Sequence, residues 1–290
     1  MMLEFKASMT AVLNKGIVDE NVKNTSSDIP QKLPIRLRLF YLSQRLRAHG
    51  LRIFDALQAG FWLGILNSDQ INAVVSNLYE ESNLYRTAAH NLNGFFPYES
   101  ELIRDHFNGC RSVVVAAAGG GREMIALARA GVRVDGFECN PGLVEKCKEF
   151  LAEAGVSGRI LYSLPDQVPS QLQQYDGGIV GYGALAHMSG RTKRVNFLRA
   201  MKDHLRPQAP LLLSVGRRPE GSRYHIWLCR FARAIRLLRG STEPVEPGDD
   251  LLNCFTHRFL ESEMRAELEE AGFKVLAYIE THDMFVVAQA

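Results

Sequence analysis

A glycine-rich turn and a later acidic residue are the parts of this sequence best suited to chemistry. The apolar run Val113–Ala116 leads into Ala117–Gly121 (Ala-Ala-Gly-Gly-Gly), and a helical pattern follows from Arg122. Glycines let the backbone bend sharply and approach a ligand closely, and a helix N-terminus offers free N–H groups to an anion. Glu138 ends the next expected strand, where a carboxylate can accept the hydroxyls of a ribose. The pattern predicts a site for a nucleoside-containing cofactor.

The spacing of the glycines argues against a dinucleotide. The dinucleotide fingerprint is G-x-G-x-x-G/A, with a small residue at its last position. A match that starts at Gly119 puts Met124 at that position, and one that starts at Ala117 puts Arg122 there. Both matches fail, so NAD(P) is the second choice of ligand.

The glycine turn and its acid resemble the first two motifs of the class I methyltransferases that use S-adenosylmethionine (SAM). In that family a hydrophobic strand leads into a loop similar to G-x-G-x-G, and an acid ends the second strand. Val134–Pro141 resembles the second-strand motif, and Tyr175–Gly183 resembles the fourth strand. The resemblance covers residues 99–290 in a consistent order. It implies that SAM is the cofactor, bound by Ala117, Ala118, Gly119, Gly121, Glu138, Asp166 and Gly181.

The sequence departs from this family at two positions. Ala117 replaces the usual first glycine of the loop, and an alanine fits there if its φ angle is negative. Val115 or Ala116 stands where many members carry an acid.

Candidates for chemistry beyond the cofactor follow the expected third and fourth strands. His187 resembles the histidine that many small-molecule methyltransferases carry after strand four, and an imidazole suits a general base; a helix-capping or backbone-bonded histidine is the alternative. Tyr182 lines the substrate pocket or packs in the core. Asp166 either binds the adenine amino group, as the resemblance implies, or is a turn aspartate after Pro165. No metal site is expected.

The elements that position these residues alternate between strand and helix from Ser112 onward, which predicts a parallel sheet with helices on both faces. The expected fold is α/β: a seven-stranded, mostly parallel Rossmann-like sheet that closes in a C-terminal antiparallel hairpin. An N-terminal helical segment precedes it: the pattern is helical from Pro34 to about Phe107, with a second apolar helix at roughly Arg52–Leu66. The expected parts are a flexible N-terminus (1–33), a helical cap (34–98), and a SAM-binding domain (99–290) with a lid-like insertion (222–250).

Composition narrows the functional class. The 290 residues are 46% hydrophobic and 23% charged, and the net charge is +2. Such a chain is not expected to bind nucleic acid, and no apolar stretch is long enough to span a membrane. The 5 cysteines show no C-x-x-C spacing, which favours reduced thiols in the cytoplasm. The oligomeric state is open, with a homodimer among the options.

These features predict a SAM-dependent methyltransferase that acts on a small-molecule acceptor. The acceptor atom is taken to be oxygen, and the helical segment and the insertion are expected to cover the pocket. The alternatives are an NAD(P)-binding oxidoreductase and a non-catalytic protein that keeps the SAM-binding fold.

Overall fold

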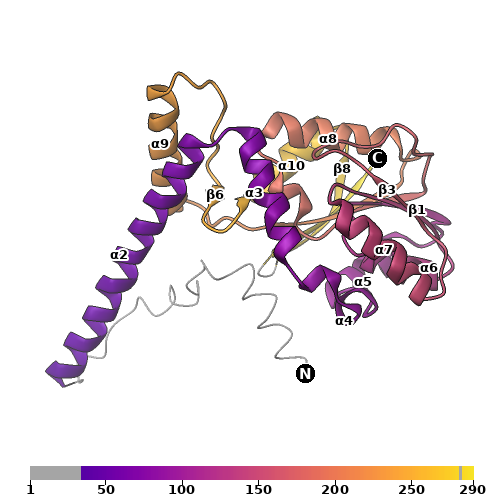
Figure 1. The fold of residues 1–290 in the computed structure, drawn as a ribbon, viewed down its shortest axis with the longest axis horizontal. Helices are drawn as coiled ribbons and strands as arrows, with labels where there is room; N and C mark the ends of the chain where they lie inside the picture. The colour runs from indigo at the N-terminus through magenta and orange to yellow at the C-terminus, as the bar shows by residue number, and fades with distance from the viewer. Residues whose placement is uncertain (1–33, 281–282) are drawn as a thin grey trace. The chain divides into compact units, whose positions relative to one another are not determined.

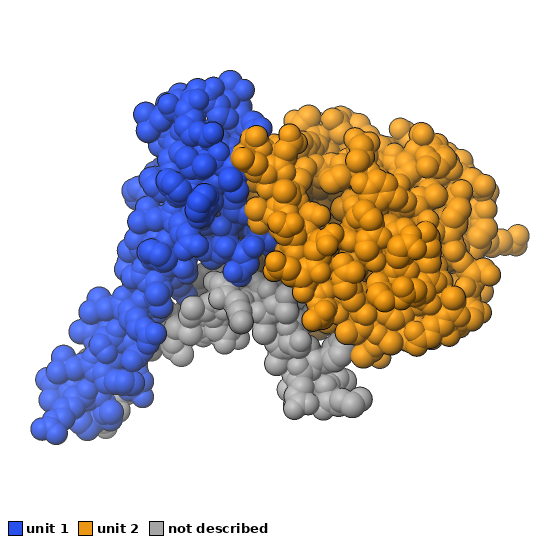
Figure 2. All heavy atoms as spheres, in the orientation of Figure 1, with its two compact units in different colours: residues 1–66, 223–254 blue, residues 67–222, 255–290 orange. Residues whose placement is uncertain are grey.

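The computed structural model describes residues 34–280 and 283–290, so the expected flexible N-terminus lies outside the described residues (Figure 1). The chain divides into two compact units (Figure 2). Unit 1 contains described residues 34–66 together with Arg223–Cys254, and unit 2 contains Asn67–Ser222 and Phe255–Ala290. Each unit is described in turn.

Unit 2 contains the predicted seven-stranded sheet, in the order β3-β2-β1-β4-β5-β9-β8. The first five strands are parallel, and β9 runs antiparallel to both β5 and β8. The predicted fold class, including the closing hairpin, is confirmed. The strands are β1 (Ser112–Ala116), β2 (Arg133–Glu138), β3 (Arg159–Tyr162), β4 (Gly177–Val180), β5 (Pro210–Gly216), β8 (Lys274–Glu280) and β9 (Asp283–Gln289).

Helices cover both faces of this sheet (Figure 1). Side chains of β1 alternate: Val114 belongs to the core cluster that includes residues of α8 and α10, and Val113 belongs to the cluster with α6 and α7. Strands buried on both faces therefore explain the continuous apolar runs. The helical elements of unit 2 are α3 (Ser68–Glu81), η2 (Leu84–Arg86), α4 (Ala88–Asn91), α5 (Pro97–His106), α6 (Arg122–Arg129), α7 (Pro141–Glu153), η3 (Ala184–His187), α8 (Arg191–Asp203) and α10 (Glu261–Glu270), and the unit also contains the short strand β7 (Phe255–His257).

The strand register brings three chain segments to one edge of the sheet. Ala116 of β1 lies opposite Phe137 of β2 on one side and Val180 of β4 on the other. Because these strands are parallel, the residues that follow them emerge side by side. This edge is where the predicted cofactor residues meet.

Unit 1 consists mainly of two packed helices, α2 (Ile35–Ile65) and α9 (Arg223–Leu238), with the short strand β6 (Asp249–Leu251). The sequence predicted a separate second helix from about Arg52, and this was wrong: α2 is continuous through Gly50. An interior glycine costs a helix only about 1 kcal/mol, which neighbouring turns offset. None of the helices in the described ranges is long and apolar enough to cross a membrane.

Small residues let α2 and α9 approach closely. A Cβ atom on Gly60 would lie 3.0 Å from the Leu228 carbonyl oxygen, and one on Gly64 would lie 2.6 Å from Ile235 Cβ. The side chains of Ala56, Ala59 and Leu63 are buried along the same part of α2. The contact therefore covers the C-terminal half of the long helix.

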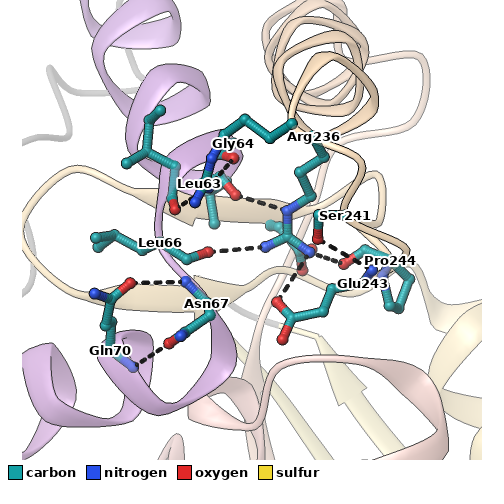
Figure 3. A network of polar contacts seen from close by, with 12 residues as sticks. Leu63, Gly64, Leu66, Asn67, Gln70, Arg236, Ser241, Glu243 and Pro244 are labelled. Carbon is teal, nitrogen blue, oxygen red and sulfur yellow. Dashed lines mark hydrogen bonds and ion pairs between the residues drawn. The ribbon is translucent and has the colours of Figure 1, made fainter.

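A buried arginine closes the end of this helix pair (Figure 3). Arg236 of α9 donates from Nε to the Leu63 carbonyl at 2.8 Å and from Nη1 to the Pro244 carbonyl at 2.9 Å. Its Nη2 lies 3.5 Å from the Leu66 carbonyl oxygen. Its Nη1 also lies 3.6 Å from the Glu243 carboxylate. The last carbonyls of a helix have no partner within the helix and carry its negative dipole end, so a cation stabilises them.

We predict that Arg236→Met destabilises unit 1 by about 3 kcal/mol, because buried carbonyls lose their donors. Hydrogen exchange of the α9 amides measures this loss. The matched control is Arg230→Met, which removes an exposed guanidinium from the same helix and should change the exchange free energy by less than about 0.5 kcal/mol. Equal protection in both variants would contradict the assignment.

Candidate functional site

The glycine turn that connects β1 to α6 contains residues in the left-handed backbone conformation. Ala117, Gly119 and Gly121 have φ angles of 50°, 54° and 93°. Gly121 is the N-cap of α6, and its N–H donates to the Ala118 carbonyl at 2.8 Å. Ala117 therefore does not take the negative φ that an alanine prefers. The left-handed region costs a residue with a Cβ atom roughly 1–2 kcal/mol, so the turn stores strain at this alanine.

Glu138 ties the end of β2 to this turn. Its Oε2 accepts the Gly119 N–H at 2.9 Å, while Oε1 accepts the N–H groups of Cys139 at 2.8 Å and Asn140 at 2.9 Å. The carboxylate is only 6% exposed. Three N–H bonds to an ionised acid are strong, so they fix the loop relative to the second strand.

Gly181 completes the edge from β4. Its N–H donates to the Ala116 carbonyl at 2.8 Å, and a Cβ atom on it would lie 2.3 Å from the Ala117 carbonyl oxygen. Only glycine fits this close approach of two backbones. The structure thus brings together Ala117, Ala118, Gly119, Gly121, Glu138 and Gly181, all named from sequence.

Asp166 follows β3 and lies in a tight turn with a φ angle of 60°. Its Oδ2 is 3.6 Å from Lys193 Nζ, and burial raises the pKa of the carboxyl against the opposing effect of Lys193. Burial, with smaller contributions that include Glu138 and Asp166, raises the pKa of the Cys139 thiol to about 12. Asp166 therefore lies in a turn after β3 and is already paired with a lysine.

A segment far from the motifs covers the glycine turn. A Cβ atom on Gly120 would lie 2.4 Å from both the Tyr85 carbonyl oxygen and Asn91 Oδ1. Asn91 is 1% exposed, and its Nδ2 donates to the carbonyls of Tyr85 and Thr87, each at 2.9 Å. These two bonds fix the amide, so Oδ1 is the acceptor, and it is buried without a hydrogen-bond partner. Such an atom suits a donor on a bound ligand. The sequence contains no motif that singles out Asn91.

An ion-pair cluster anchors the same turn from α5. Arg122, the first residue of α6, binds both oxygens of Glu99, at 2.6 Å and 2.9 Å, and Glu123 at 2.5 Å. Its guanidinium also lies 3.8 Å from the centre of the Phe96 ring. A bidentate, buried arginine pair is geometrically specific, so it fixes the entry of the turn into α6.

His187 lies in η3 after β4, with both ring nitrogens in hydrogen bonds. Nδ1 is 2.7 Å from the Phe255 carbonyl oxygen, and Nε2 is 2.9 Å from the Tyr79 hydroxyl. Because a carbonyl oxygen only accepts hydrogen bonds, Nδ1 carries the ring proton, and Nε2 accepts a hydrogen bond from the Tyr79 hydroxyl. Burial lowers the pKa of His187, partly opposed by the bond to Phe255, which favours the neutral ring. The partner Tyr79 could not be found from sequence.

Tyr182 lies two residues after β4, and its hydroxyl donates to the carboxylate of Asp283 in β9. Burial first, and then the Asp283 charge, raise its pKa well above the usual range. Its ring lies 5.6 Å from Phe96 and 6.2 Å from Phe285, measured between ring centroids. Tyr182 therefore belongs to a set of aromatic rings beside the strand ends.

Comparisons with known proteins place this geometry in a known fold. No protein-family model and no curated protein matches the chain. Among solved structures, the 1,6-didemethyltoxoflavin-N1-methyltransferase of Burkholderia thailandensis is 15% identical, with a TM-score of 0.55, over 77% of this chain and 90% of that one. A SAM-dependent methyltransferase of Methanosarcina mazei is 16% identical, with a TM-score of 0.49, over 68% of this chain and 98% of that one. The chain thus has the Rossmann-like fold of SAM-dependent methyltransferases, as the sequence predicted.

We predict that Ala117→Gly stabilises the protein by about 1 kcal/mol, because glycine adopts the left-handed φ angle without strain. Urea unfolding measures the change. The neighbouring variant Ala118→Gly is the control: Ala118 is buried and has no positive φ angle, so glycine there should destabilise by about 1 kcal/mol. A loss of stability in both variants would show that Ala117 is not strained.

His90, beside Tyr85 and Phe96, makes stability depend on pH. Burial, helped by the Arg122 charge, lowers its pKa to about 4. The unfolded chain therefore takes up the proton first, and stability present above about pH 6.5 is lost as the pH falls toward about 4. We predict that His90→Phe removes about 2 kcal/mol of the wild-type loss between about pH 7 and pH 5, as measured by urea unfolding. An identical pH dependence in both proteins would refute this.

Proposed function

We propose that this protein is a SAM-dependent methyltransferase that acts on a small-molecule acceptor. The observation that carries the proposal is the bond between Glu138 and the Gly119 N–H. It places a buried carboxylate and a glycine turn at one edge of a Rossmann-like sheet, where a nucleoside with an anionic end can bind both.

The residues at this edge match the chemical groups of SAM. Glu138 has about four acceptor directions, and three backbone N–H groups leave one on Oε2 for a ribose hydroxyl. The turn leads into the N-terminus of α6, whose positive dipole end suits the carboxylate of the methionine part, and Asn91 Oδ1 suits its ammonium. Asp166 is proposed to receive the adenine amino group. SAM supplies an activated methyl group, so the protein mainly has to align the acceptor.

His187 is the proposed general base. With Nδ1 bound to the Phe255 carbonyl and its pKa lowered by burial, the ring is neutral and has a lone pair on Nε2. The Tyr79 hydroxyl donates a hydrogen bond to that lone pair. Tyr79 therefore passes its own proton to Nε2 and takes up the proton of an acceptor hydroxyl. This relay makes oxygen the proposed acceptor atom.

The acceptor is proposed to be a planar small molecule that contacts aromatic side chains. Rings of Tyr79, Tyr85, Phe96 and Tyr182 lie near the turn and the base, and adjacent rings lie 5.2–5.6 Å apart in the pairs Tyr79–Tyr85 and Phe96–Tyr182. Aromatic rings favour stacked or edge contacts with other rings. The Burkholderia thailandensis methyltransferase, which has a similar fold, holds 1,6-didemethyltoxoflavin and S-adenosylhomocysteine. A cytoplasmic location is proposed as well, because none of the five cysteines, all of which lie in the described residues, forms a disulfide.

Calorimetric titration with S-adenosylhomocysteine tests the cofactor site. We expect wild-type binding and a loss of about 1.5–3 kcal/mol in Glu138→Ala, because charge-assisted hydrogen bonds disappear. The control is Glu145→Ala, an exposed glutamate on α7, which should bind like the wild type.

Two outcomes would overturn the proposal. Tight binding of NADH without binding of S-adenosylhomocysteine would indicate an oxidoreductase. Binding of neither ligand would indicate a protein that keeps the fold without the activity.

A further inference from the structure

Hydrogen-bond donors without an acceptor gather at the start of α7. Asn140, the N-cap of this helix, is 2% exposed, and its Oδ1 accepts the Leu143 N–H at 3.0 Å. Because that bond fixes the orientation of the amide, the other polar atom is the donor Nδ2. This Nδ2 is buried and has no hydrogen-bond partner among the described residues. A buried donor of this kind calls for an acceptor on a ligand.

The side chain of Arg86 brings a second set of donors to the same place. A Cβ atom on Gly142, the second residue of α7, would lie 3.0 Å from both Nη1 and Nη2 of Arg86 and 3.2 Å from Asn140 Oδ1. The guanidinium and the amide therefore meet at one point of the helix start, where glycine leaves room for both. Arg86 Nε is buried without a hydrogen-bond partner, and no carboxylate in the described part of the chain forms an ion pair with Arg86.

The helix backbone adds a third donor. Pro141 has no N–H, and Asn140 accepts the N–H groups of Leu143 and Val144. The Gly142 N–H remains, and the described residues offer it no acceptor. Pro141 is exposed, and Gly142 and Arg86 are half-buried, so this end of the helix is open to solvent.

A guanidinium in this position is unfavourable unless an anion accompanies it. The N-terminus of a helix is the positive end of its dipole, and the first turn of α7 contains no acidic residue. The buried arginines described above have acceptors instead: Arg122 binds two glutamates, and Arg236 binds carbonyls near the end of a helix. The charge of Arg86 and the helix dipole therefore repel each other until a ligand supplies negative charge.

We propose that Arg86, Asn140 Nδ2 and the Gly142 N–H bind a phosphate group at the start of α7. Arginine and the N-terminus of a helix are the partners that phosphate oxygens favour in proteins. Donors from three separate groups match the three terminal oxygens of a phosphate ester better than the two oxygens of a carboxylate. The backbone beside Arg86 is fixed, because the neighbouring Tyr85 carbonyl accepts Asn91 Nδ2 at 2.9 Å.

The phosphate site adjoins the candidate cofactor site. The Asn140 N–H donates to Glu138 Oε1 at 2.9 Å, so both sites lie at the same edge of the sheet. The phosphate is either free phosphate or part of a larger aromatic ligand that also enters the candidate site. Only the second source rests on the proposed function, because the binding of free phosphate needs neither SAM nor an acceptor.

Isothermal titration calorimetry with inorganic phosphate and with phenyl phosphate, at constant ionic strength in chloride buffer, tests the site. The wild type should bind both compounds, and Arg86→Met should weaken binding at least about 10-fold, because charge-assisted hydrogen bonds disappear. The matched control Arg265→Met removes an exposed guanidinium from α10 and should bind like the wild type. Tighter binding of phenyl phosphate assigns the phosphate to an aromatic ligand, and equal binding assigns free phosphate; both support the site.

Asn140→Asp separates a ligand site from a structural one. Aspartate keeps the capping bond to the Leu143 N–H and replaces the donor Nδ2 by an anionic oxygen. This variant should also weaken phosphate binding at least about 10-fold. Without phosphate it should unfold at a higher urea concentration than the wild type, because its carboxylate pairs with Arg86 and with the helix dipole. Arg86→Met should lose no stability under the same conditions.

Circular dichroism checks that each variant is folded. The proposal is overturned if the wild type binds neither phosphate compound, or if the folded Arg86 and Asn140 variants bind as tightly as the wild type. A lower urea midpoint of Asn140→Asp without phosphate would also overturn it, because Nδ2 would then stabilise the protein itself.

Discussion

The carboxylate of Glu138 is the constraint on which the candidate site depends. It accepts backbone N–H groups on both sides of the gap between β1 and β2, one from the glycine turn and two from the start of the next loop. Because a buried ionised acid requires such donors, the loops and the acid fix one another. The strained Ala117 belongs to the same turn, and the backbone of Gly181 at the end of β4 approaches it closely.

The fold could be predicted because its signals are local. Apolar runs such as Ser112–Ala116, followed by glycine or proline, mark strands that are buried on both faces, and each strand is followed by a helical pattern. The separate helix expected from about Arg52 was wrong, because the glycine before it, Gly50, weakens a helix without ending it. The positive φ angle of Ala117 could not be predicted from the sequence either. The residue type gives only a conformational preference, and tertiary contacts determine the backbone angle that is adopted.

The candidate site could be predicted only in part. Residues that directly follow strands meet at one edge by topology, so Ala117, Glu138 and Gly181 could be named together. Asn91 and Tyr79 could not, because they come from the helical segment before the sheet and carry no motif; Tyr79 lies 108 positions from its partner His187. Contacts of this kind depend on how the cover packs, which no local pattern encodes.

The discontinuity of unit 1 has a consequence for the order in which the protein folds. Its two helices are separated in the chain by all of Asn67–Ser222, so α2 is synthesised long before α9 exists. Closing such a long loop is entropically unfavourable unless the intervening chain is already compact. Compaction of Asn67–Ser222 therefore favours the docking of α9 on α2. Until α9 docks, the α2 side chains that it covers, such as Ala59 and Leu63, are available to chaperones on the nascent chain.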